Sequence, residues 1–138
     1  MEYSKAVACI AGGAQGIVCF CQQSQGVLVT AQISGLPKEG FFALHIHEGT
    51  DCRGVGFPNT GGHYNPTGAP HPDHAGDLPP LISCGGNAYL SVLTDRFRLE
   101  QVIGRTLVIH SRRDDFTTQP AGDAGTKIAC GTIRPHCP

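Results

Sequence analysis

The chain has 138 residues and a formal net charge of −1, and only 15% of its residues are charged. We expect one domain, residues 1–138, because this length suits a single hydrophobic core. No basic run indicates a nucleic-acid partner, and no apolar stretch approaches the length of a membrane span. We therefore expect neither nucleic acid nor membrane as a partner.

Alternation of apolar and polar residues predicts eight short strands. In chain order they are residues 5–11, 16–23, 26–34, 41–47, 86–93, 97–101, 106–110 and 127–133. Segments 48–81 and 111–126 lack periodicity, and loops of that length are usually functional or disordered. The pattern predicts an all-β fold, an eight-stranded antiparallel Greek-key barrel (an immunoglobulin-like sandwich) with two long functional loops.

Six of the seven histidines and one aspartate form a metal-ligand pattern: His45-x-His47, His63, His71-x-x-His74-x-x-Asp77 and His110. Imidazole suits copper and zinc, and a carboxylate can complete a zinc site. Residues two apart on a strand share a face, so His45 and His47 are expected on one side of theirs. Taken alone, each segment also fits surface histidines or a solvated polar loop.

Seven ligands are too many for one tetrahedral metal and one too few for two separate four-ligand sites. A shared histidine resolves this count. One set suits tetrahedral zinc: His63, His71, His74 and Asp77. The other offers four imidazoles, which suit copper: His45, His47, His63 and His110. His63 would then bridge the two ions, whose charge would lower the pKa of its ring enough to remove both protons.

Five segments, in this order, resemble motifs of the copper/zinc superoxide dismutase family: FFALHIHE, GGHYNP, HAGDLP, RTLVIHSRRDD and GDAGTKIACGTI. The resemblance covers nearly the full chain. It implies the two ligand sets given above, held outside the barrel by the long loops. It also implies an oxidoreductase that dismutates superoxide, a small anion, to oxygen and hydrogen peroxide. The redox-cycling metal is expected to be copper, bridged through His63 to a structural zinc, with His63 taking up and returning a proton.

The same resemblance implies a disulfide between Cys52 and Cys130, which would restrain the first long loop. It implies that Asp114 links a copper-bound and a zinc-bound histidine by hydrogen bonds and so orients both rings. A homodimer is one possible assembly, and the sequence does not reveal the oligomeric state.

Lys127 stands where the family normally has an arginine beside the copper. Lysine keeps the positive charge that attracts an anion but loses the planar fork of donors. We therefore expect Lys127 to act with His63 in catalysis, with activity that is reduced or more sensitive to salt. The short His71–His74 spacing and the short second loop resemble bacterial members of the family.

The chain has seven cysteines, an odd number that fits either a disulfide framework with one spare thiol or mostly free thiols. Strand parity places Cys19 and Cys21 outward, with Cys9 on the facing strand. These three could bind Cu(I), form a cross-strand disulfide, lie in a subunit contact or stay unpaired, and we favour unpaired thiols. Cys84 and Cys137 lie at turn and tail positions.

The N-terminal residues MEYSKAVACIAGG lack the features of a signal peptide. We therefore expect a cytoplasmic protein as written, or a periplasmic or secreted one if a signal was removed. The alternative function is a copper-binding or delivery protein on the same fold, because Cys19-x-Cys21 superficially resembles a copper-chaperone motif. A relative that binds zinc alone is a third hypothesis. The complete ligand set favours the enzyme.

Overall fold

The computed structural model describes residues 3–136, so Cys137 lies outside the described residues. The strands are β1 (Lys5–Gly12), β2 (Gln15–Gln23), β3 (Gly26–Ser34), β4 (Gly40–Phe42), β5 (Leu44–His47), β6 (Leu81–Ser83), β7 (Ala88–Thr94), β8 (Thr106–His110) and β9 (Lys127–Pro135). Two short helical segments are η1 (Pro58–Thr60) and α1 (Leu99–Val102). Among the described residues, no helix has the length and apolar character needed to cross a bilayer.

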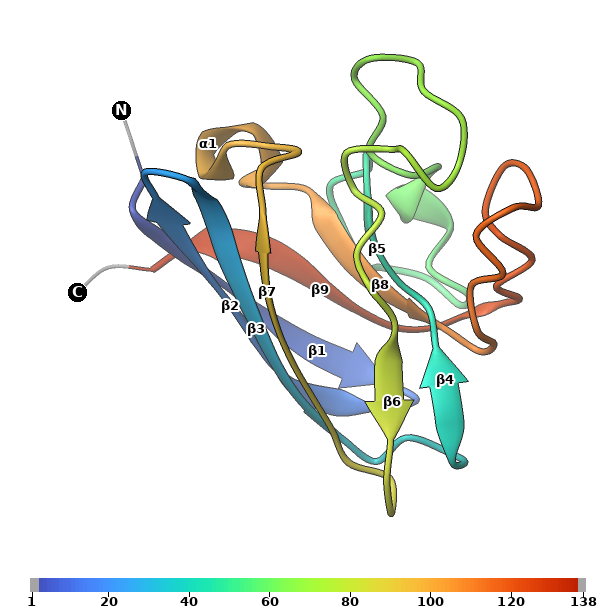
Figure 1. The fold of residues 1–138 in the computed structure, drawn as a ribbon. Coiled ribbons are helices and arrows are strands. Elements are labelled where there is room, and N and C mark those ends of the chain that lie inside the picture. The colour runs from blue at the N-terminus through green and yellow to red at the C-terminus, as the bar shows by residue number, and fades with distance from the viewer. Residues whose placement is uncertain (1–2, 137–138) are drawn as a thin grey trace.

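Seven strands form one curled antiparallel sheet in the order β5-β8-β9-β1-β2-β3-β7, and β4 and β6 pair in a separate ribbon. Figure 1 shows this sheet curling as a half-barrel, with the β4–β6 ribbon on its open side. Neighbours far apart in sequence, such as β5 with β8 and β3 with β7, require the crossovers of a Greek-key topology. The expected all-β antiparallel architecture is confirmed.

The strand pattern predicted from the sequence differs from the structure at three places. The segment 97–101 is not a strand, because Leu99 and Val102 are both buried and begin and end the helical turn α1. The backbone N–H of Arg98 donates to Oε1 of Gln101 at 2.8 Å, which closes that turn. The short strand β6 was not anticipated, and it falls at the end of the segment expected to be a loop. The predicted strand 41–47 is divided at Ala43 into β4 and β5.

Along β2, buried and exposed side chains alternate as the sequence predicts. Val18 and Phe20 are fully buried in the core, whereas Cys19 is exposed and Cys21 is half-buried on the other face. In the β1–β2 register Cys9 lies opposite Ile17, one diagonal step from Cys19. All three cysteines carry free thiols, so the cross-strand disulfide does not form.

The expected disulfide between Cys52 and Cys130 is confirmed, with Cα atoms 5.8 Å apart and a sequence separation of 78. Cys130 lies on β9, whose neighbours are β8 and β1, and Cys52 lies in the first long loop. The bond therefore fastens the start of that loop to the middle of the sheet.

Candidate metal centre

The first long loop lies along the free edge of β5 as if it were a further strand. Backbone N–H groups of Ile46 and Leu78 donate to the carbonyls of Gly76 and Leu44, and that of Tyr64 donates to Ile46. A Cβ at Gly76 would lie 2.3 Å from the carbonyl oxygen of Ile46, so only glycine permits this close approach. These contacts satisfy edge groups that would otherwise lack partners.

This edge pairing determines which side chains meet. It forms isolated bridges that set His63 beside His47 and Asp77 beside His45, although the members of each pair lie far apart in the sequence. The second long loop follows β8 (Figure 1), and its residues Asp114 and Gln119 hydrogen-bond to His71 of the first loop. His45 and His47 are buried outside the barrel core because the two loops cover them.

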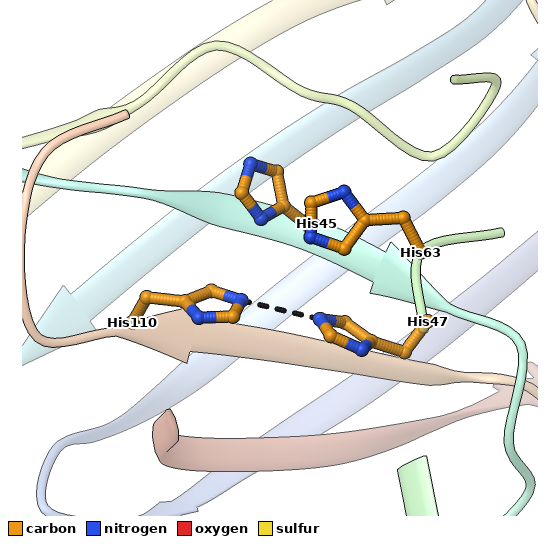
Figure 2. A group of neighbouring side chains, drawn as sticks. All are labelled: His45, His47, His63 and His110. Atoms are coloured by element: carbon orange, nitrogen blue, oxygen red, sulfur yellow. Dashed lines mark hydrogen bonds between the residues drawn. The ribbon is translucent and has the colours of Figure 1, made fainter. Parts of the chain in front are cut away.

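Four histidines expected to hold copper converge in a single group. One ring nitrogen from each lies within 4.8 Å of the others: His45, His47, His63 and His110. Figure 2 shows the rings of His47 and His110 pointing toward each other from β5 and β8, with their Nε2 atoms 3.1 Å apart. His45 and His63 lie beside them with ring centroids 4.0 Å apart.

In two of the rings, a hydrogen bond to one nitrogen determines that the other nitrogen is free to bind a metal. Nδ1 of His47 lies 2.8 Å from the carbonyl oxygen of Gly61, which can only accept, so Nδ1 carries the proton and Nε2 keeps its lone pair. Nε2 of His45 donates to the Asp114 carboxylate, which leaves Nδ1 with a lone pair. Nδ1 of His45 and Nε2 of His63 are both buried, and neither has a hydrogen-bond partner among the described residues.

The four residues expected to hold zinc meet around one carboxylate. Asp77 places Oδ1 2.8 Å from Nδ1 of His63, and Oδ2 2.9 Å from Nδ1 of His71 and 3.1 Å from Nδ1 of His74. Ligand atoms of His45, in place of His74, also group with His63, His71 and Asp77 within 4.8 Å. We assign His74 to this set because it contacts Asp77 directly, whereas Nε2 of His45 is taken by Asp114.

Asp114 lies between the two groups, as the resemblance implied. Its Oδ2 accepts from Nε2 of His45 at 2.8 Å and its Oδ1 accepts from Nε2 of His71 at 2.7 Å. Since Nε2 of His71 donates, its Nδ1 presents a lone pair to the Asp77 oxygen 2.9 Å away. Two lone pairs at that distance repel unless a cation lies between them. Gly122, with φ +70, passes so close that a Cβ would lie 2.0 Å from Oδ1 of Asp114.

Burial keeps four of the rings neutral and able to bind metal. Burial lowers the pKa of His47 to about 3 and that of His110 to about 2, and repulsion from nearby imidazoles, were they protonated, adds to the effect at His110. Burial also lowers the pKa of His45 and His74. At neutral pH these side chains therefore carry lone pairs and compete little with protons for a cation.

The carboxylates stay ionised despite their burial. Burial alone would raise the pKa of Asp114, but hydrogen bonds from His45 and His71 outweigh it and lower that pKa. The pKa of Asp77 is lowered in the same way, because the hydrogen bond from His63 overcomes the effect of burial. The residues present therefore fit copper in the all-histidine group and zinc in the group that contains Asp77. Their roles as ligands remain predictions.

Lys127 lies at the open side of the all-histidine group. It lines one hollow together with His47, His63 and His110. Its Nζ donates to Oγ1 of Thr60 at 2.7 Å and to the carbonyl oxygen of Gly61 at 3.2 Å. Burial lowers the pKa of Lys127. The ammonium therefore stands beside the histidines as the charge that an anion entering the hollow would meet.

Three residues that support the site escaped the sequence analysis. Gln119 brackets His71, accepting from its backbone N–H at 2.8 Å and donating to its carbonyl at 2.7 Å. Arg96 donates to the carbonyl oxygens of Pro72 and His74 in the first long loop. Thr60, buried at the end of η1, accepts a hydrogen bond from Nζ of Lys127. No motif marks them, because each acts through a contact between segments distant in sequence.

The fold and the paired histidine groups together define a β-sandwich metalloprotein with a two-metal centre. The family model for copper/zinc superoxide dismutase (SODC) matches residues 14–133. "Superoxide dismutase [Cu-Zn] 2" of Aquifex aeolicus (strain VF5) is 38% identical over 128 aligned residues, which cover 82% of this chain and 75% of that protein. The "Superoxide dismutase [Cu-Zn]" of Deinococcus radiodurans is 33% identical, covering 89% and 79%. That of Legionella pneumophila is 35% identical, covering 86% and 77%. The chain belongs to the copper/zinc superoxide dismutase family.

Proposed function

We propose that this protein is a superoxide dismutase that converts two superoxide ions and two protons into one oxygen molecule and one hydrogen peroxide. The observation that carries the proposal is the convergence of two donor groups on one shared histidine. Nδ1 of His63 lies 2.8 Å from Asp77 in the zinc group, while its Nε2 is buried and unpartnered in the copper group. The relatives named above support the same activity.

Copper, when bound, supplies one-electron redox chemistry, and zinc supplies a fixed positive charge that has none. The protein's own contribution is to hold the donors and to manage protons and charge. His63 lines the same hollow as Lys127 and its Nε2 has no hydrogen-bond partner among the described residues, so this nitrogen can hold a proton and pass it to a reduced oxygen species. Nδ1 stays on the Asp77 side and preserves the orientation of the ring.

Lys127 attracts the anionic substrate. Its ammonium is the positive side chain that lines the hollow beside His47, His63 and His110. A cation placed there raises the local concentration of superoxide and its rate of encounter with the site. Asp114 acts behind the donors by holding the rings of His45 and His71. The site thus combines attraction, orientation and proton delivery.

A copper-binding or delivery protein without turnover is less well supported. Delivery requires release of the ion, whereas four buried nitrogens and rings held by hydrogen bonds favour retention. Metal analysis combined with a superoxide-decay assay distinguishes a dismutase from a copper-delivery protein. One copper and one zinc per chain with rapid decay of superoxide supports the dismutase, and full metal loading without faster decay would refute it.

We also propose a homodimer, which the family resemblance supports. Light scattering over a range of protein concentrations should give twice the mass of the chain, and a constant mass of one chain would contradict the proposal.

For the compartment we propose the cytoplasm. The support is that Cys9, Cys19 and Cys84 are exposed free thiols, which persist most readily in a reducing environment. The Cys52–Cys130 bond favours the alternative, a periplasmic or secreted protein. Cell fractionation, with alkylation of free thiols before lysis, distinguishes the two.

A further inference from the structure

Lys127 offers an anion fewer hydrogen-bond donors than an arginine would offer at the same position. A guanidinium has five donors in a rigid fork, whereas an ammonium has three donors on a flexible four-carbon stem. Left to itself, such a side chain would spread its charge over many rotamers. In this structure Nζ has two oxygen acceptors on the first long loop, the hydroxyl of the buried Thr60 at 2.7 Å and the carbonyl of Gly61 at 3.2 Å.

The hydroxyl of Thr60 can act toward Lys127 only as a hydrogen-bond acceptor. It donates its only proton to the carbonyl oxygen of Phe57 at 2.9 Å, so toward Lys127 it can act only as an acceptor. Thr60 is fully buried, and its carbonyl accepts from the backbone N–H of Gly49 at 2.7 Å. Its position at the end of η1 is therefore rigid.

The same short segment also orients a predicted copper ligand. The carbonyl of Gly61, adjacent to Thr60, accepts from Nδ1 of His47 at 2.8 Å and from Nζ of Lys127. One turn of the first long loop thus sets both the imidazole and the ammonium. Two of the three ammonium donors are taken up by this turn, which leaves one for an anion in the hollow.

We infer that Thr60 is a positioning residue for substrate attraction: its hydroxyl holds the Lys127 ammonium beside the histidines and compensates for the missing guanidinium fork. The inference deepens the proposed function and rests on it for its kinetic consequence. The placement of the ammonium, however, can be measured in the metal-free protein without any assay of activity.

The first test is Thr60→Val, which keeps the shape of the side chain and removes the hydroxyl, with Thr60→Ser as the variant that restores it. In metal-free protein labelled with ¹⁵N in lysine, hydrogen exchange of the Lys127 ammonium should be roughly tenfold faster in T60V than in the wild type. T60S should exchange as the wild type does. Unchanged exchange in T60V would overturn the inference.

The second test uses the metal-loaded protein. T60V should lower the second-order rate of superoxide decay roughly threefold to tenfold at low salt and weaken its dependence on ionic strength, and T60S should restore both. In a Lys127→Ala background T60V should have no further effect, because the two residues act together. An equal loss in both backgrounds would show a merely structural role and refute the inference.

Thr30→Val is the matched control, because Thr30 lies on β3, away from both long loops. It should change neither measurement. Thermal melts check that each variant folds, and Thr60→Ala replaces T60V if the latter does not. If the loaded wild type fails to accelerate superoxide decay, the proposed function fails, while the exchange experiment still decides whether Thr60 places Lys127.

Discussion

Asp114 accepts a hydrogen bond from Nε2 of His45 at 2.8 Å, and this contact settles the tautomer of a predicted copper ligand. Its other oxygen does the same for His71 in the zinc group. One carboxylate therefore determines that both rings present a lone pair at Nδ1.

Asp114→Asn should weaken binding of both metals about 10- to 100-fold. An amide offers one acceptor oxygen, so only one of the two rings keeps its partner, and the other faces an NH₂ group that cannot accept. Competition with chelators for copper and for zinc measures the effect. Asp115→Asn is the control, because Asp115 is half-buried and, within residues 3–136, its carboxylate accepts from Thr117 and Thr118 and from neither metal group. Unchanged affinity in D114N would remove the bridging role.

Cys52→Ser should lower the free energy of unfolding by about 4–5 kcal/mol, because the disulfide closes a loop of 78 residues in the unfolded chain. Urea titration of the metal-free protein measures this difference. Cys84→Ser, which alters an exposed free thiol, should be close to neutral. Equal unfolding midpoints for C52S and C84S would contradict the prediction.

Lys127→Arg should raise the rate of superoxide decay at high salt. The planar guanidinium can keep the acceptors of Thr60 and Gly61 and still offer paired donors to an anion, and close hydrogen bonds are screened less than distant charge. Rates measured across a salt series test this, with Lys5→Arg on β1 as the control. If K127R and the wild type have the same salt dependence, Lys127 does not guide the substrate.

The metal-free protein should lose stability as the pH falls below about 6.5. His47 and His110 have folded-state pKa values of about 3 and about 2, well below the unfolded value near 6.5. Between these limits the unfolded chain binds more protons, so acidification favours unfolding by about 1.4 kcal/mol per pH unit for each histidine.

Thermal melts of the metal-free protein at pH 7, 6 and 5 measure that slope. A variant with both His47→Asn and His110→Asn should show a shallower slope, because neither asparagine titrates. A constant melting temperature over this range would refute the predicted linkage.

Much of the strand pattern was readable from the sequence because alternation records directly which face of a strand is apolar. Val18 and Phe20 point inward and Cys19 points outward, as their parity requires. The segment 97–101 was misread because its burial follows a helical turn, with Leu99 and Val102 three residues apart. A single helical turn is too short for its periodicity to be distinguished from that of a strand.

The sequence by itself determined the donor types, their number and the need for a shared histidine, since these follow from composition and the coordination preferences of metals. Only the tertiary structure decided that loop residues 62–64 and 76–78 pair with the edge of β5, and so bring His63 and Asp77 to His47 and His45. It alone revealed that Thr60 meets Lys127 across 67 residues. The physical reason is that local patterning encodes burial, whereas pairing between distant backbones depends on which unsatisfied edge groups the completed fold leaves available.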